Sequence, residues 1–138
     1  MATITKNALA DEKQHTGTPY GTAITLHFAV TTNASGAVVN SNVATGVAAG
    51  DVVRLGILPA GMRLDDAKTL VTTGWTATVT GKLGFAYVDG IDSATAPQDD
   101  DYFGSGITIA TAGRYAASNT GVRPVVLPKD AYLILTTA

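Results

Sequence analysis

The residues best suited to chemistry in this sequence are five aspartates within one polar stretch: Asp89, Asp92, Asp99, Asp100 and Asp101. Carboxylates are the hard oxygen ligands that Ca²⁺ takes in proteins. The spacing departs from an EF-hand loop, because Gly90 directly follows the first aspartate and no terminal glutamate closes the loop. We therefore predict a solvated loop whose acidic side chains repel one another, and we keep a calcium site on the five aspartates as an alternative.

Two histidines, His15 and His27, are the side chains that would titrate near neutral pH. Metal and catalytic sites need several His, Asp or Glu side chains that converge, and no such spacing surrounds either histidine. We predict that His27 lines the polar face of a strand and binds no ligand.

Motifs for nucleophilic and phosphate chemistry are absent. Ser105 lies between two glycines but lacks the full G-x-S-x-G elbow, and the neighbours Asp65 and Asp66 would point to opposite faces of a strand. The phosphate-binding patterns G-x-x-x-x-G-K and G-x-G-x-x-G are missing, and so is cysteine, which excludes disulfides and thiolate sites. We predict a non-enzymatic protein with no catalytic residue, metal or cofactor; a small hydrolase that uses Ser105 is the competing interpretation.

Length and charge favour one domain whose surface is partly covered. The chain has 138 residues, of which 46% are hydrophobic and 14% charged, against about 25% charged in an average soluble domain. Its net charge is −2 with no basic stripe, so we expect no nucleic-acid partner. No signal-peptide-like start and no apolar run of about 18 residues is present, so we expect a soluble chain, made in the cytoplasm, with no membrane partner. Low charge is unusual for a free monomer, which indicates that another protein covers part of the surface.

Alternation of apolar and polar residues predicts strands along most of the chain. The stretches that show it, or that are apolar on both faces, are residues 22–30, 52–58, 62–73, 75–87, 107–111, 125–127 and 131–135. We predict a bulge or bend at Asp65-Asp66, and residues 75–87 form either one long strand or a hairpin about Gly81. The segment 131–135 is apolar on both faces, so both must be covered. About seven to nine short strands with frequent turn signals predict an all-β fold, an antiparallel β-sandwich or barrel over residues 21–138.

The first 20 residues differ from the rest. Asn7 is placed to cap a short helix over residues 8–14, and a turn-rich stretch follows it. A helix this short is marginal in water. We predict an N-terminal arm over residues 1–20 that lies against its own domain or against a neighbour.

Four segments of the chain resemble the small decoration, or cement, proteins of tailed bacteriophage capsids. They are GILPAGMRLDDA at 56–67, GFAYVDG at 84–90, DYFG at 101–104 and LPKDAYLILT at 127–136. The resemblance implies a jelly-roll-like sandwich, commonly a homotrimer, seated outside the capsid at three-fold or quasi-three-fold positions. The implied role is to bridge major capsid protein subunits and to stabilise the shell against the pressure of packaged DNA. It also implies that the protein is located on the virion.

If the resemblance holds, the arm is the natural anchor. We predict that Ile4, Leu9 and Tyr20 of the arm contact the capsid. The alternative function is a carbohydrate- or receptor-binding β-module, which needs an exposed aromatic platform. Tyr102 and Tyr115 are the residues we would substitute to test for such a platform.

Overall fold

The computed structural model describes residues 1–7, 23–76, 78–120 and 123–138, and within them the chain is all-β. No helix occurs in these ranges, and therefore none that could cross a membrane. The strands of the described part are β1 (Thr3–Thr5), β2 (Val52–Leu58), β3 (Arg63–Leu64), β4 (Lys68–Val71), β5 (Thr80–Tyr87), β6 (Asp99–Thr108), β7 (Gly113–Ala116), β8 (Val125–Val126) and β9 (Ala131–Thr137).

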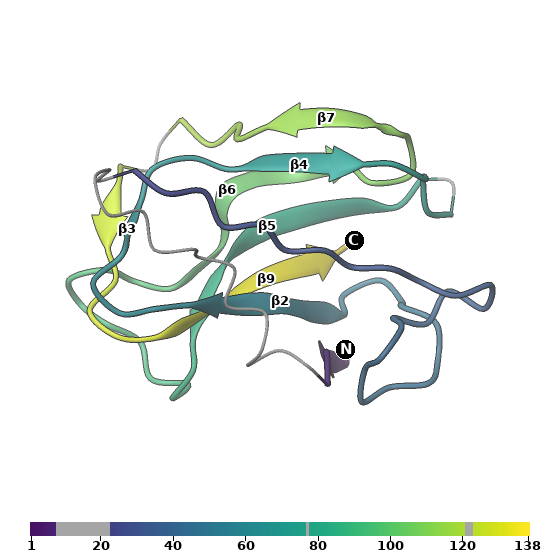
Figure 1. Cartoon of the computed structure of the whole chain (residues 1–138), viewed down its shortest axis with the longest axis horizontal. Helices are drawn as coiled ribbons and strands as arrows, with labels where there is room; N and C mark the ends of the chain where they lie inside the picture. Colours follow the sequence, from purple (N-terminus) through teal and green to yellow (C-terminus); the bar gives the residue numbers. More distant parts are fainter. Residues whose placement is uncertain (8–22, 77, 121–122) are drawn as a thin grey trace.

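The largest sheet has five strands in the order β1-β2-β9-β5-β6 (Figure 1). Strand β1 runs parallel to β2, and the other neighbouring pairs are antiparallel. The apolar β9 is at the centre, paired with β2 on one side and with β5 along its whole length on the other. Ile134 and Leu135 point to opposite faces of β9, and each is only 6% exposed, so the prediction that both faces are covered is confirmed.

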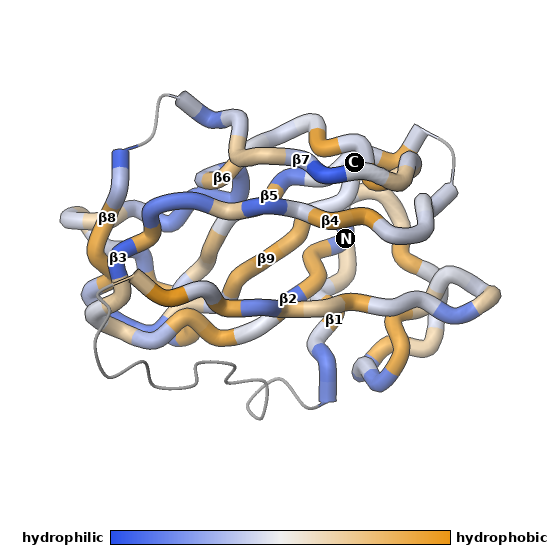
Figure 2. The backbone as a smooth tube through the Cα atoms, turned by 45° about the horizontal axis from the view of Figure 1, so that its top comes forward, coloured by the Kyte–Doolittle hydropathy of each residue, from blue (hydrophilic) through white to orange (hydrophobic). Residues whose placement is uncertain are grey.

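Two short antiparallel pairs, β3–β8 and β4–β7, form a second layer. Leu64 of β3 is buried in the same core cluster as the large sheet's inner side chains, and Val71, Tyr115 and Val125 pack against that cluster. Figure 2 shows the apolar residues concentrated along the strands that enclose this core, β9 above all. The core therefore lies between the five-stranded sheet and the two pairs, in a sandwich-like arrangement.

Residues 23–30, predicted as a strand, are extended but belong to no sheet. Leu26, Phe28 and Val30 are half-buried and pack against the core, as their alternation predicts, whereas Ile24 of the same parity is 45% exposed. Phe28 lies directly on Gly56 of β2, where a Cβ would come within 2.1 Å of the ring. The prediction of a paired strand is wrong, because alternation reports which side chains are buried and not whether the backbone finds a partner.

Two other predicted strands are interrupted. Residues 62–73 form two separate strands, β3 and β4, with a break at residues 65–67, where we had predicted a bulge or bend. Trp75, Thr76, Thr78 and Val79 belong to no strand and only Thr80–Tyr87 is one, so neither a single strand nor a hairpin about Gly81 is correct. The backbone explains the second error, because Thr78 has a φ of 72°, which no strand residue adopts.

The acidic stretch and the region after it also differ from expectation. Strand β6 begins at Asp99, inside the predicted polar loop, and ends at Thr108. Strand β7, Gly113–Ala116, lies in a region predicted as loop and pairs with β4. Small and charged residues on these strands gave no apolar periodicity from which the strands could be predicted.

The start of the predicted arm is part of the domain. Thr3–Thr5 form β1 at the edge of the large sheet, and Ile4 is 1% exposed in the core. The expected helix over residues 8–14, together with Leu9, His15 and Tyr20, lies outside the described residues.

Candidate functional site

The structure separates the five aspartates into groups with different tasks. Asp89 accepts a hydrogen bond of 2.8 Å from Lys129 Nζ, and this bond is the main reason that the pKa of Asp89 is lowered. Asp92 instead accepts hydrogen bonds from the backbone amides of Ser93 and Gln98, at 2.8 and 2.7 Å. Both carboxylates hold the loop in shape and are occupied by protein partners.

The remaining three, Asp99, Asp100 and Asp101, offer carboxylate oxygens within 4.8 Å of one another. A hydrogen bond with the Asp99 carboxyl is the largest cause of the raised pKa of Asp101, followed by burial. Asp100 forms an ion pair of 3.3 Å with Lys82. Three carboxylates this close suit a hard cation chemically, and calcium binding by them stays a prediction.

The other residues singled out from the sequence are not brought together. Asp65 is paired with Arg63 at 2.7 Å, and Asp66 caps the amide of Ala67 at 2.8 Å. His27 and Ser105 are both exposed, on the extended segment and on β6. Of the predicted capsid contacts, only Ile4 is described.

Ile4 offers almost no surface to a neighbouring protein in this structure, because its own domain encloses it. An anchoring role for Ile4 would therefore need the β1 edge to open, and its evident task is to fill the core.

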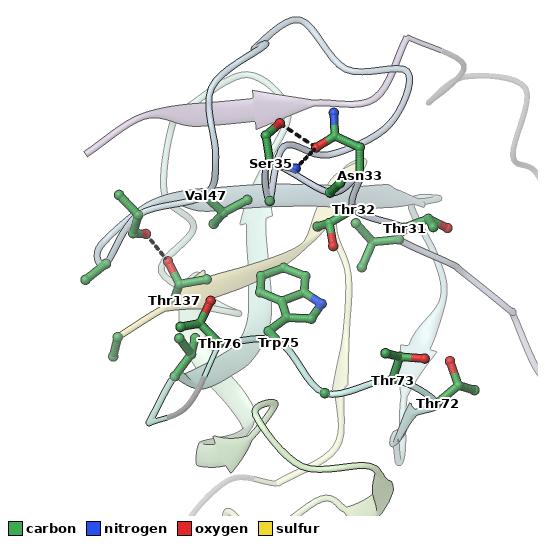
Figure 3. A pocket seen from close by; sticks show the side chains of 18 residues that line it. Thr31, Thr32, Asn33, Ser35, Val47, Thr72, Thr73, Trp75, Thr76 and Thr137 are labelled. Atoms are coloured by element: carbon green, nitrogen blue, oxygen red, sulfur yellow. Dashed lines mark hydrogen bonds between the residues drawn. The ribbon is translucent and has the colours of Figure 1, made fainter.

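The structure also contains a cleft of about 600 Å³ that sequence reasoning did not find (Figure 3). Three segments far apart in the sequence build it, together with the end of β9. Its lining residues are Val30, Thr31, Thr32, Asn33, Ala34, Ser35, Gly36, Val47, Ala48, Ala49, Thr72, Thr73, Gly74, Trp75, Thr76, Val79, Thr137 and Ala138. We call this the Trp75 cleft.

Backbone contacts position Trp75 in the cleft. Its amide donates to the carbonyl oxygen of Ile109 at 3.0 Å. The preceding Gly74 lies so close to the backbone of Ala110 that a Cβ would come within 2.1 Å of its carbonyl oxygen. The indole is half-buried and packs against the core on one side. Figure 3 shows its other side turned toward the cleft.

A tight turn over residues 33–37 forms the wall opposite the indole. The side-chain oxygen of Asn33 accepts hydrogen bonds from the Ser35 amide, the Ser35 hydroxyl and the Ala37 amide, at 3.0, 2.7 and 3.0 Å. Gly36 has a φ of 79°, which the turn requires. The Val47 amide donates to the Gly36 carbonyl oxygen at 3.1 Å, so the turn is fixed to the third segment.

The third segment is held in turn by β9 and by a buried carboxylate. The Thr137 hydroxyl donates to the Ala48 carbonyl oxygen at 2.6 Å. Asp51 accepts hydrogen bonds from the amides of Ala48 and Ala2, at 2.9 and 2.6 Å, and these bonds lower its pKa. The cleft is therefore a built structure with walls that are each hydrogen-bonded to the body of the protein.

The polar groups of the cleft are largely free to bind a ligand. The Trp75 indole N–H makes no hydrogen bond to any residue that the structure describes. The same holds, within those ranges, for five threonine hydroxyls of the cleft: Thr31, Thr32, Thr72, Thr73 and Thr76. None of the lining side chains is ionisable. Such a surface can bind an uncharged ligand that both donates and accepts hydrogen bonds.

The sequence carried a weak signal for this cleft. Trp75 shares its parity with Phe85 and Tyr87, which favours a core position, and the alternating threonines after it are typical of an exposed strand face. Trp75 is the only tryptophan of the chain, and it lies in a stretch of glycine and threonine without large apolar neighbours. That setting is atypical of a core position.

No family model matches the chain, and neither the curated proteins nor the solved structures contain a significant match to it.

Proposed function

We propose that this protein is a decoration protein of a tailed bacteriophage capsid, which binds the outside of the shell as a homotrimer and bridges major capsid protein subunits. In this proposal its role is to stabilise the shell on the virion, it has no enzymatic activity, and its fold is a jelly-roll-like variant of the sandwich. The proposal starts from the resemblance of four segments, and the arrangement of these segments supports it.

Three of the four segments contribute turns that meet at one end of the molecule. These turns, residues 59–62, 88–91 and 127–130, are called here the turn cluster. Gly61 donates a backbone hydrogen bond of 2.8 Å to the Leu127 carbonyl oxygen. Asp130, which belongs to the third turn, accepts hydrogen bonds from both of the other turns.

The Asp130 carboxylate accepts from the Ala60 amide at 2.8 Å, and its carbonyl oxygen accepts from the Val88 amide at 3.1 Å. Three of the four resembling segments therefore form one hydrogen-bonded unit, although Ala60 and Asp130 are 70 positions apart in the sequence.

Exposed apolar side chains on and beside the turn cluster are the observation that carries the proposal. Val88 and Ile91 are 43% and 66% exposed in the second turn, and Val126, next to the third, is 56% exposed. Burial of apolar surface is the main driving force for stable association, and the charged side chains Asp89 and Lys129 of the cluster are already paired with each other at 2.8 Å. Many copies on one shell would add their individually weak contacts.

The proposal is tested with empty shells of the phage whose genome encodes this chain, prepared without this protein. We expect the protein to sediment with such shells and to be a trimer by multi-angle light scattering. The double substitution Val88→Ser and Ile91→Ser should weaken shell binding at least tenfold. Leu70→Ser is the matched control, because Leu70 is 56% exposed on β4, away from the turn cluster. A monomer that does not bind shells would refute the proposal.

The second candidate is a carbohydrate-binding module, and one observation favours it. Of the two residues that we had considered for a platform, Tyr102 is 7% exposed and its hydroxyl donates to the Leu64 carbonyl oxygen, whereas Tyr115 is half-buried. Tyr87 and Phe103 are buried as well. Trp75 is the aromatic side chain that faces a cleft with free polar groups.

A further inference from the structure

We propose that the Trp75 cleft binds a neutral saccharide, with one sugar ring lying on the indole of Trp75 and its hydroxyls bonded to the threonines around it. This inference deepens the second candidate function and does not rest on the capsid proposal.

The absence of basic groups defines the first property of the ligand. Eighteen residues line the cleft, none has an ionisable side chain, and the α-carboxylate of Ala138 places a negative charge at one edge. An anionic ligand would lose its hydration without gaining a counter-charge, which costs several kcal/mol for a buried ion, and the Ala138 carboxylate would repel it. An uncharged ligand does not incur this cost. Phosphorylated or acidic molecules are therefore disfavoured.

Free hydrogen-bonding groups define the second property. The five threonine hydroxyls each donate one hydrogen bond and accept others, and the indole N–H of Trp75 donates one. Figure 3 places the hydroxyl of Thr32 on the wall that faces the indole, and Thr76 on the opposite side of the ring. Sugar hydroxyls also donate and accept, so they can pair with threonine hydroxyls in either direction. An apolar ligand would leave these groups unsatisfied.

The indole defines the third property. A pyranose ring is polar at its edge but has an apolar face of C–H groups, and such a face can stack on the π-surface of an aromatic ring. Trp75 is half-buried, so its ring is held in place by the core and turns its free side to the cleft. An apolar ring surface surrounded by hydroxyls matches the sugar's own arrangement of an apolar face and a polar edge.

Size and rigidity agree with a small ligand. A volume of about 600 Å³ lies within the range of about 300–1,000 Å³ that is usual for small-molecule sites. The Asn33 turn and the Gly74–Ala110 contact fix two of the walls before any ligand binds. Thr78 adds a local strain, because a β-branched residue at a φ of 72° is costly, and strain of this kind is concentrated at ligand-binding sites.

The experiment uses the full chain and its single tryptophan as the reporter. Emission of Trp75 is recorded while the protein is titrated with maltotriose, cellotriose, chitotriose and mannotriose, each up to about 20 mM, beyond the millimolar dissociation constants typical of weak sites. Trigalacturonic acid serves as the acidic probe. We expect a saturable change in emission with at least one neutral trisaccharide and a dissociation constant at least tenfold weaker for the acidic one.

Substitutions then locate the binding. Thr32→Val removes one hydroxyl at nearly constant volume and should weaken binding about fivefold, the effect expected for one hydrogen bond. Trp75→Phe, followed by calorimetry because the reporter is lost, should weaken it at least tenfold. Thr3→Val on β1 is the matched control and should leave the affinity unchanged, since Thr3 does not line the cleft. Circular dichroism verifies the fold of each variant, and Thr32→Val carries the test if Trp75→Phe does not fold.

Three results would overturn the inference: no neutral trisaccharide alters the emission, the acidic probe binds as tightly as the neutral ones, or Thr3→Val weakens binding as much as Thr32→Val. None of these three results would contradict the capsid proposal, because shell binding depends on the turn cluster and is measured separately, by sedimentation with empty shells. Loss of shell binding with intact saccharide binding would refute the capsid proposal alone.

Discussion

Substitution of Gly56 by alanine tests how the extended segment 23–30 is attached to the domain. Gly56 lies at the irregularity in the pairing of β2 with β9, and Phe28 covers it. A Cβ at this position would lie 2.1 Å from Cε1 and 2.2 Å from Cδ1 of Phe28, whereas ordinary contacts begin near 3.4 Å. Gly56 does not have a positive φ, so its backbone conformation accepts alanine and the clash with the ring is the only obstacle.

The size of the effect follows from the surface that the ring must give up. To restore a normal contact, the Phe28 ring has to move by more than about 1 Å, and close packing leaves it no space within the core. A phenylalanine buries about 150–250 Å², and we expect roughly 100 Å² of this to return to water. At about 25 cal/mol per Å², Gly56→Ala should cost about 2.5 kcal/mol of unfolding free energy and lower Tm by about 8 °C.

A double-mutant cycle isolates the contact. Urea unfolding is followed by circular dichroism for Gly56→Ala, Phe28→Ala and the double variant, at one protein concentration. Phe28→Ala alone should cost about 2–3 kcal/mol, below the usual range for a fully buried ring because Phe28 is only half-buried. In the Phe28→Ala background the added methyl enters vacated space, so Gly56→Ala should then change stability by less than about 0.5 kcal/mol.

The reasoning is refuted if the two substitutions are additive. Additivity would mean that the cost of Gly56→Ala arises in the backbone of β2 and that Phe28 does not lie on it. A cost below about 0.5 kcal/mol in the unmodified background would likewise show that the segment is not packed as described.

Three further predictions concern single groups. Ile4→Ala should destabilise the fold by about 3 kcal/mol, measured by urea unfolding, because it empties a fully buried site; an unchanged midpoint would contradict the placement of β1 in the core. Asp51 has a lowered pKa, so its contribution to stability is complete above its ordinary value of 3.8 and is lost as the pH falls through the lower folded-state pKa. Acid unfolding of Asp51→Asn should therefore show a smaller loss of stability below about pH 4 than the unmodified protein, and equal slopes would be evidence against the two amide hydrogen bonds. Thr136→Val should raise stability by about 1 kcal/mol in a thermal melt, because the buried Thr136 hydroxyl lacks a partner among the described residues; a lower Tm would show that the hydroxyl is bonded.

The features predictable from the sequence are those that local chemistry determines. Pro59-Ala60-Gly61 and Asp89-Gly90 carry turn signals in the sequence, and both glycines have positive φ in the structure, at 83° and 72°. Alternation along residues 23–30 correctly predicted that Leu26, Phe28 and Val30 face the core, although Ile24, which has the same parity, is 45% exposed. In each case the signal lies within a few residues of the feature that it predicts.

The features that could not be predicted depend on partners distant in the sequence. Strand β1 pairs with a segment 49 positions further along the chain, and its three residues carry no periodicity of their own. The Trp75 cleft needs three segments to meet, and none of them suggests a site when it is considered alone. Burial can be inferred from a pattern of residue types, whereas the choice of backbone partner is decided by the competition among all segments during folding.

The positions of the two proposed sites follow from the central strand. Strand β9 begins at Ala131, directly after the turn cluster, and ends at Thr137, which lines the Trp75 cleft. Seven residues of strand span about 20 Å, so the two surfaces lie at opposite ends of the sheet (Figure 1). A molecule seated on a shell through its turn cluster would hold the cleft away from the shell, open to solution. Groups so far apart, with no shared partner, act independently to within a few tenths of a kcal/mol, and so a saccharide in the cleft would neither require nor prevent attachment at the other end.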